Sequence, residues 1–194
     1  MSEAGKKQTE GETTISENRA LSGVPVMERE VTALLEEISS CPETAAVAVG
    51  GSRATGKADK KSDYDIYVYV EMEIAKERRK SILEKYCGVM EIGNHYWESE
   101  DNCTLNNGVD IDIIYRKLQD FEGDVAAVVE QYRASNGYTT CMWHNLVTCR
   151  ILYDRDGALE AMKKRFDVPY PEVLRAEIIR KNRSEERRVG KECR

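Results

Sequence analysis

The order of apolar segments in this 194-residue chain predicts an α+β (mixed α/β) fold, in which a small mixed β-sheet is flanked by helices. Short runs rich in valine, isoleucine and tyrosine are typical of strands, and they alternate with longer stretches whose apolar residues recur at helical spacing. Apolar residues make up 41% of the chain, which is enough for a core and too much for wholesale disorder. Charged residues make up 33%. The net charge of −6 disfavours a broad nucleic-acid-binding surface, because such surfaces are basic.

In the first half of the chain, residue spacing predicts two helices and two strands. Residues 27–40 place apolar side chains on one helical face, and Pro42 follows the expected helix end. Residues 45–49 form a valine-rich run that stops at two glycines, as a strand followed by a tight turn does. A polar connection leads to residues 63–70, a strand rich in β-branched and aromatic residues, and residues 73–86 return to helical spacing.

The second half begins with a mixed stretch and then becomes regular. Residues 90–97 predict a short strand, and the polar stretch that follows, up to residue 108, predicts a loop. Residues 109–116 form a third clear strand, and residues 118–135 form a helix that turns Tyr132 inward. The remaining elements are a helix that leads into a short strand over residues 142–154, a DRDG turn, a helix over residues 158–166, and a helix opened by Pro171.

These elements divide the chain into four parts. Residues 1–26 are polar and lack periodicity, which predicts a disordered segment. Residues 27–167 hold the alternating helices and strands and form the predicted domain, and residues 168–182 begin a C-terminal helical region. We expect this region to be truncated, because residues 183–194 break its pattern.

The last residues also match a sequence that is not a protein. A common sequencing adapter, read as codons, translates to RSEERRVGKEC, which accounts for every residue from Arg183 to Cys193. A solvated basic tail is the alternative interpretation. We expect that the natural reading frame diverges after Asn182, so that residues 183–194 form a non-native tail.

No stretch approaches the ~20 apolar residues that a membrane span needs, and the N-terminal residues lack the hydrophobic segment of an export signal. The six cysteines match no zinc-binding spacing. We therefore expect reduced thiols in a cytoplasmic protein that contacts no membrane.

The first chemical motif is Gly50-Gly51-Ser52, directly after the valine-rich strand. Glycines there let backbone N–H groups approach a phosphate closely, and the serine hydroxyl adds a donor. An ordinary turn is the alternative interpretation of the same residues.

The second motif is a pair of acids, Asp63 and Asp65, at the start of a strand. Alternate strand residues point the same way, so the two carboxylates project from one face. Carboxylates this close repel one another unless a cation neutralises them, and hard oxygen ligands favour Mg²⁺ or Mn²⁺. Solvated acids at a strand edge are the alternative.

A third acid, Asp110 or Asp112, lies within the next clear strand and is flanked by apolar residues. A third carboxylate on a neighbouring strand is what a two-metal phosphoryl-transfer site requires.

The order of these motifs resembles the nucleotidyltransferase superfamily of the DNA polymerase beta type. Within it, the chain resembles small bacterial nucleotidyltransferase-domain proteins related to aminoglycoside nucleotidyltransferases. The resemblance covers roughly residues 31–167, is most specific in GGSRATG and SDYDIYVYV, and extends to ILYDRDG. It implies that Gly50, Gly51 and Ser52 bind nucleotide phosphates, that Asp63 and Asp65 bind the metals, and that Asp110 or Asp112 helps to activate the acceptor hydroxyl.

Between the two candidates for the third acid, we favour Asp112. The family places this acid a few residues before a helix, and Asp112 lies nearer to the helix expected to start near Leu118. Asp112 also lies deeper in the apolar run, where a carboxylate without a cation is costly. Two basic residues near the glycine turn, Arg53 and Lys57, are expected either to contact the triphosphate or to face solvent.

These expectations combine into an enzyme that transfers a nucleoside monophosphate from an NTP, expected to be ATP, to an acceptor hydroxyl and releases pyrophosphate. The acidic balance favours a small, cationic, aminoglycoside-like acceptor. The alternatives are transfer to RNA or protein, and a non-catalytic binding or toxin–antitoxin module that retains the fold.

Overall fold

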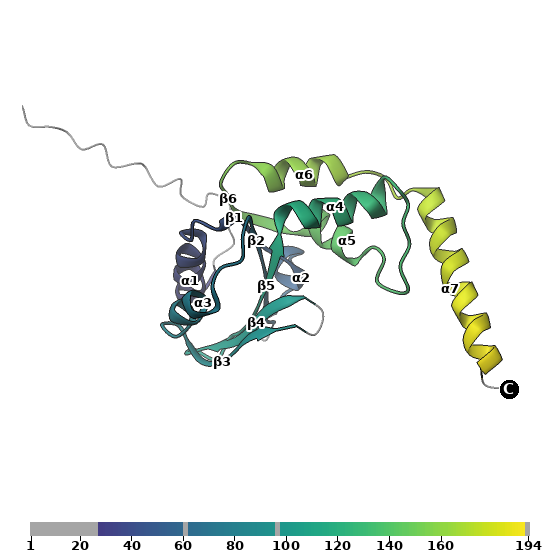
Figure 1. Cartoon of the computed structure of the whole chain (residues 1–194). Coiled ribbons are helices and arrows are strands. Elements are labelled where there is room, and N and C mark those ends of the chain that lie inside the picture. The colour runs from purple at the N-terminus through teal and green to yellow at the C-terminus, as the bar shows by residue number, and fades with distance from the viewer. Residues whose placement is uncertain (1–26, 60–61, 96–97, 193–194) are drawn as a thin grey trace, which may run out of the picture.

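A computed structural model describes residues 27–59, 62–95 and 98–192 (Figure 1). The strands are β1 (Thr44–Val49), β2 (Tyr64–Val70), β3 (Cys87–Asn94), β4 (Ser99–Leu105), β5 (Asp110–Lys117) and β6 (Arg150–Asp154). The helices are α1 (Arg29–Ser39), α2 (Gly51–Ala54), α3 (Lys76–Leu83), α4 (Leu118–Val129), α5 (Cys141–Thr148), α6 (Ala158–Phe166) and α7 (Glu172–Glu192).

Over the described residues, the strands form one six-stranded sheet in the order β3-β4-β5-β2-β1-β6. The central strands β2 and β5 are parallel, and the other neighbours are antiparallel. The predicted α+β class with a mixed sheet flanked by helices is therefore confirmed.

Two groups of helices cover the two faces of this sheet (Figure 1). The alternation along β2 explains why: Tyr64 and Ile66 pack in one core cluster with α1 and α3, whereas Tyr67 and Tyr69 pack in a second cluster with α4, α5 and α6. Helices α1, α4 and α6 are amphipathic, and each buries its apolar face against the sheet. The two cores fix which face each strand residue occupies.

One expected loop is a strand. The polar stretch up to residue 108 was predicted to be a loop, but β4 occupies most of it and pairs with β3 and β5. Its alternation is real, since Asp101, Cys103 and Leu105 are buried on one face while the residues between them are not. The first of these buried residues is Asp101, a polar residue. The sequence therefore does not show the alternation of apolar and polar residues that marks a strand.

The helix expected over residues 118–135 is also shorter than predicted. It ends at Val129, and Tyr132, predicted to point inward, is an exposed residue with a φ of 57°. The strand expected over residues 90–97 begins earlier, at Cys87, and its last two expected residues lie outside the described ranges. The other predicted helices and strands are confirmed to within a few residues.

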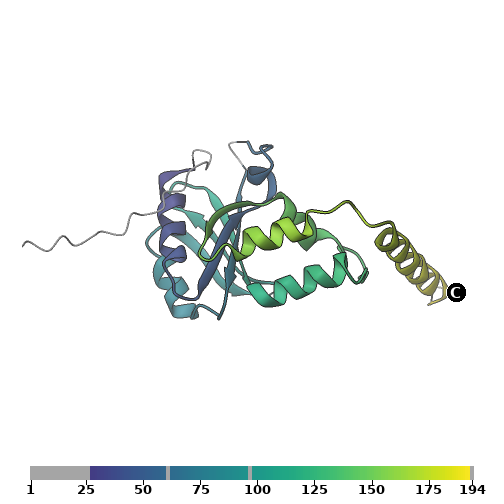
Figure 2. The same cartoon turned by 90° about the horizontal axis from the view of Figure 1, so that it is seen from above.

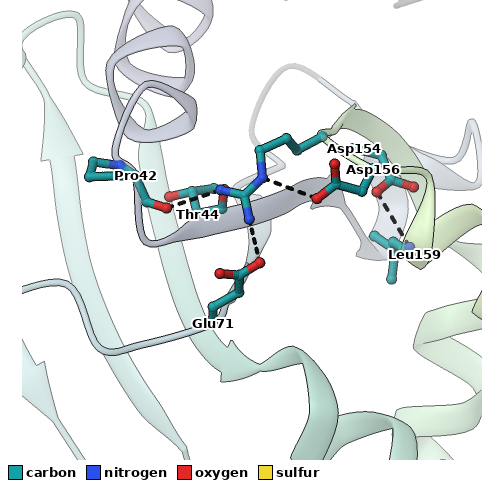
Figure 3. Close-up of polar contacts among 7 residues, drawn as sticks. Pro42, Thr44, Glu71, Asp154, Asp156 and Leu159 are labelled. Atoms are coloured by element: carbon teal, nitrogen blue, oxygen red, sulfur yellow. Dashed lines mark hydrogen bonds and ion pairs between the residues drawn. The ribbon is translucent and has the colours of Figure 1, made fainter.

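The ILYDRDG segment has a structural role at the end of β6 (Figure 3). The guanidinium of Arg155 donates to the carbonyl oxygens of Pro42 (3.0 Å) and Thr44 (3.3 Å) and forms ion pairs with Glu71 and Asp156. It thereby ties β6 to the turn before β1 and to the residue after β2.

The preceding residue, Asp154, fixes the start of α6. Its carboxylate accepts the backbone N–H groups of Leu159 (3.4 Å) and Glu160 (2.9 Å), which have no partner within the helix. Gly157, at a φ of 74°, makes the reversal between β6 and α6 possible.

The C-terminal helix α7 contacts the domain through its first turns. Leu174 is fully buried in the second core cluster, Ile178 packs against it, and the Lys181 ammonium donates to the carbonyl oxygen of Ala134 at 2.7 Å. Figure 2 shows the rest of α7 leading away from the sheet. Helix α7 continues to Glu192, so the break expected after Asn182 does not occur in the backbone up to that residue. The expected non-native origin of residues 183–194 and the expected domain boundaries stay predictions.

Two other expectations concern the ends and the thiols. The predicted disordered segment, residues 1–26, lies outside the described ranges. Within those ranges the cysteines are free thiols, and none of the helices is long and apolar enough to cross a membrane. The cytoplasmic location stays a prediction.

Candidate active site

The parallel pairing of β2 and β5 places two of the predicted acids next to each other. Asp65 is the register partner of Asp112. Their strand neighbours Tyr64 and Ile111 are buried against α1 and α3, so both carboxylates project from the opposite face of the sheet. Asp63 is exposed in the segment that enters β2, two residues before Asp65. The acids therefore lie together at the N-terminal ends of two parallel strands.

These carboxylates receive no compensation from nearby basic side chains. Within the part of the chain that the structure describes, neither Asp65 nor Asp112 forms an ion pair. Burial raises the pKa of the Asp65 carboxyl above its usual range, and the Asp63 and Asp112 carboxylates raise it further. The site holds negative charges together at a cost that an external cation would remove.

The donor chemistry of this cluster fits a hard divalent cation. Carboxylate oxygens are the ligands that Mg²⁺ and Mn²⁺ prefer, and both strands present them on one face. The side chains are not arranged as a finished site, however. Among the described residues, no three His, Cys, Asp or Glu side chains lie close enough to hold a metal ion.

The two candidates for the third acid differ in their position relative to β2. Asp112 is half-buried and directly opposite Asp65, whereas Asp110 is exposed and precedes the paired part of β5. Each accepts one hydrogen bond from β4: Asn102 donates to Asp112 and Thr104 donates to Asp110, both at 2.7 Å. The helix after them begins at Leu118, as expected.

The glycine turn lies directly against the acids. The backbone N–H of Gly50 donates to the carbonyl oxygen of Asp65 at 2.8 Å, and Gly51 adopts a φ of 57°. A Cβ atom at Gly51 would lie 1.9 Å from Oδ2 of Asp65, and one at Gly50 would lie 2.3 Å from the ring of Tyr67. Only glycine allows the chain to approach the carboxylate this closely. Ser52 follows in the first turn of α2 and is partly exposed.

The two basic residues after the turn occupy different environments. The guanidinium of Arg53 donates to the carbonyl oxygens of Ser62 and Asp63 and lies 3.7 Å over the ring of Tyr64. Arg53 thus fixes the segment that carries Asp63. Lys57 is exposed. Contact of either side chain with a triphosphate stays a prediction.

A second group of polar residues continues from the acids along the same face of the sheet. Arg116 of β5 is buried between the rings of Tyr67 (4.4 Å) and Phe121 (4.9 Å). It donates through Nε and one terminal nitrogen to both oxygens of Glu98, at 2.7 and 2.6 Å. Burial raises the pKa of Tyr67 to about 12, so its phenol stays protonated, and Asn145 donates to its oxygen at 2.9 Å.

Sequence reasoning assigned no role to Arg116, Tyr67 or Asn145, nor to Thr104 of β4, whereas Glu98 and Asn102 belong to a polar stretch that the sequence allows either to line an acceptor pocket or to face solvent. For Asn102 and Thr104, the signal is the alternation of β4, which places both residues on the same face as the acids. That signal is usable only once β4 is recognised as a strand beside β5.

Comparison with known families decides the assignment. Residues 31–134 match the family described as nucleotidyltransferase domain. The chain belongs to this family. The matched segment contains the glycine turn, both acid-bearing strands and the β4 residues that contact the third acid. The resemblance expected from the motifs is thereby confirmed, as is the enzyme class of nucleotidyltransferase.

Solved structures with distant similarity were also found. A crystal structure of a toxin-antitoxin with AMP-PNP is 14% identical, with a TM-score of 0.38, over 87% of this chain and 98% of that chain. The apo form of a CCA-adding enzyme is 19% identical, with a TM-score of 0.37, over 69% of this chain and 31% of that chain. No curated protein sequence matches the chain.

Proposed function

We propose that this nucleotidyltransferase transfers a nucleoside monophosphate from ATP to a hydroxyl group of a small acceptor and releases pyrophosphate. We assign Mg²⁺ or Mn²⁺ to Asp63, Asp65 and Asp112, and the nucleotide phosphates to Gly50, Gly51 and Ser52. We further propose that Arg53 and Lys57 contact the triphosphate and that Asp110 orients the acceptor.

The observation that carries this proposal is the register pair Asp65 and Asp112, with the glycine turn against it. Two uncompensated carboxylates on neighbouring parallel strands, beside a backbone that has no side chain in the way, suit a metal–triphosphate complex. If these acids were purely structural, we would expect a basic partner beside them, such as the one that Arg79 provides for the buried Asp101.

Each of these residues would have a separate role in the reaction. Bound divalent ions would neutralise the acids and the developing charge on the phosphates. The N–H groups of the glycine turn and the Ser52 hydroxyl would hold the triphosphate in line. The acceptor oxygen would attack the α-phosphorus as the bond between that phosphorus and the bridging oxygen breaks. The hydroxyl proton would pass to the Asp112 carboxylate, and pyrophosphate would leave.

The acceptor side favours a small cationic molecule. The face that carries the acids continues over β4 and β3, where Glu100 lies two residues before Asn102 on β4 and Glu91 is the register partner of Asn102 on β3. Together with the net charge of −6, these acids favour an amino-sugar acceptor, which carries both cationic amines and hydroxyl groups, over RNA.

The test is calorimetric binding of a non-hydrolysable ATP analogue with and without Mg²⁺, followed by pyrophosphate release against panels of amino sugars, other hydroxyl compounds and RNA. We expect Mg²⁺-dependent binding that Asp65→Asn abolishes and Asp124→Asn, an exposed acid of α4, leaves intact. Metal-independent binding, or none, would reject the catalytic proposal in favour of a binding module.

A further inference from the structure

The neighbour of the third acid on β4 is an asparagine. Asn102 and Asp112 are register partners on the antiparallel strands β4 and β5, and the Asn102 amide nitrogen donates to Oδ1 of Asp112 at 2.7 Å. Both side chains are half-buried. Asp112 therefore lies between its two register partners, Asn102 on β4 and Asp65 on β2.

The contacts of the Asn102 side chain with Asp112 and Asn94 fix the orientation of its amide group. Asn94 donates to the Asn102 side-chain oxygen at 3.2 Å. Because an ionised carboxylate only accepts hydrogen bonds, Asn102 must turn its NH₂ group to Asp112 and its oxygen to Asn94. Asn94 reaches this face because the β3–β4 register shifts after Ile92, where Gly93 has a φ of 77°.

We infer that Asn102 is a positioning residue for the metal site, an inference that rests on the proposed function. Its amide occupies one oxygen of Asp112 and thereby sets the rotation of the carboxylate, leaving the other oxygen for the metal or the acceptor hydroxyl. A neutral donor suits this task. It stabilises Asp112 beside the like-charged Asp65 without adding a positive charge that would compete with a cation.

The chain contains a matched control for this contact. Thr104 donates to Oδ1 of Asp110 at 2.7 Å, from the same strand and the same face, two residues along β4. Its acid lies outside the paired part of β2 and β5. Loss of the Thr104 donor should therefore leave metal binding unchanged if Asp112 is the third acid.

The experiment compares Asn102→Leu and Asn102→Ser with Thr104→Val in the full chain. Mn²⁺ affinity is measured by electron paramagnetic resonance in the presence of a non-hydrolysable ATP analogue, and melting temperature is recorded for each variant. We expect both Asn102 variants to weaken Mn²⁺ binding about tenfold or more, as losses around metal ligands commonly do. Thr104→Val should stay within about twofold of wild type, since the expected loss requires contact with a metal ligand. The KM for the nucleotide should change less than the half-saturating Mg²⁺ concentration.

Three results would overturn the inference. If wild type binds Mn²⁺ with the analogue and both folded Asn102 variants match it, Asn102 does not position the site, although the proposed function stands. If Thr104→Val weakens Mn²⁺ binding and the Asn102 variants do not, Asp110 is the acid that matters. If wild type itself shows no Mn²⁺-dependent binding, the proposed function fails and the inference fails with it.

Discussion

One aspartate on one face of the sheet and a pair of aspartates on the opposite face have opposite electrostatic surroundings. On the α1–α3 face, Asp101 is fully buried, and Arg79 of α3 donates to its Oδ1 at 2.7 Å, as does the backbone N–H of Gly93 at 2.8 Å. On the other face, Asp65 and Asp112 are half-buried side by side, and Asp112 accepts a hydrogen bond from the neutral amide of Asn102.

The pKa shifts express the same contrast. The pKa of Asp101 and the pKa of Asp65 are both raised, chiefly by burial. The surroundings act in opposite directions: Arg79 offsets part of the rise at Asp101, whereas Asp63 and Asp112 add to the rise at Asp65. A carboxylate that the fold neutralises itself serves stability. A pair that the fold leaves uncompensated is stabilised only by a charge from outside, which is the property a cation site needs.

Among the substitutions that test this contrast, Asp65→Asn should have the largest effect, which is on turnover. The amide keeps the shape but cannot neutralise a divalent cation as a carboxylate does, so we expect turnover to fall by roughly 10³-fold or more. The melting temperature of the metal-free protein should stay equal or rise, because one of two repelling charges is gone. Initial rates and thermal melts measure both; turnover above a tenth of wild type would contradict the metal assignment.

On the opposite face, Arg79→Met should affect stability instead of metal binding. It leaves the Asp101 carboxylate buried without its cation, which should lower the free energy of unfolding by about 3–5 kcal/mol. Lys80→Met, which breaks an exposed pair with Glu84 on the same helix, should cost less than about 1 kcal/mol. Urea unfolding measures both.

The double variant Arg79→Met/Asp101→Leu tests the cause of that loss. Replacing both charges removes the uncompensated carboxylate, so stability should recover most of the way. Equal instability of the single and double variants would mean that Arg79 acts through packing against the Tyr115 ring, which lies 4.6 Å away, and not through charge.

The same contrast explains what the sequence could and could not predict. The prediction that Asp63 and Asp65 share a face rests on the two-residue period of a single strand, and the glycine turn follows from its position after an apolar run. Both are local properties. Hence β2, the turn and the candidate acids were all predicted from the sequence.

Local sequence patterns do not show which strands are neighbours in the sheet. The pairing of Asp65 with Asp112 depends on β5 being the parallel neighbour of β2, 47 positions later in the chain. The strand β4 was missed for a related reason: its buried Asp101 is acceptable only because Arg79, from a helix 22 residues earlier, neutralises it. The contact of Asn102 with Asp112 could not be predicted without β4.

The choice between the two candidates for the third acid gives the next prediction. Asp112→Asn should reduce turnover by about 10²-fold at saturating Mg²⁺ and ATP, because the amide cannot accept the acceptor proton. Asp110→Asn should stay near wild type, because Asp110 is exposed and lies outside the paired segment. The reverse pattern in steady-state rates would reassign the third acid to Asp110.

The smallest effect should come from the glycine turn, where two glycines form a matched pair. Gly51 and Gly56 both have positive φ values, 57° and 73°, so alanine at either position should cost about 1 kcal/mol of stability through backbone strain. Only at Gly51 does the new Cβ meet the site, 1.9 Å from Oδ2 of Asp65, whereas nothing lies within 4 Å of one at Gly56. Gly51→Ala must therefore displace the Asp65 carboxylate, and we expect the KM for ATP to rise about tenfold, equivalent to ~1.4 kcal/mol. Gly56→Ala should leave the KM unchanged at a similar loss of melting temperature. If both variants shift the KM equally, the turn acts through its backbone conformation alone, and the close approach of Gly51 to the acid has no part in nucleotide binding.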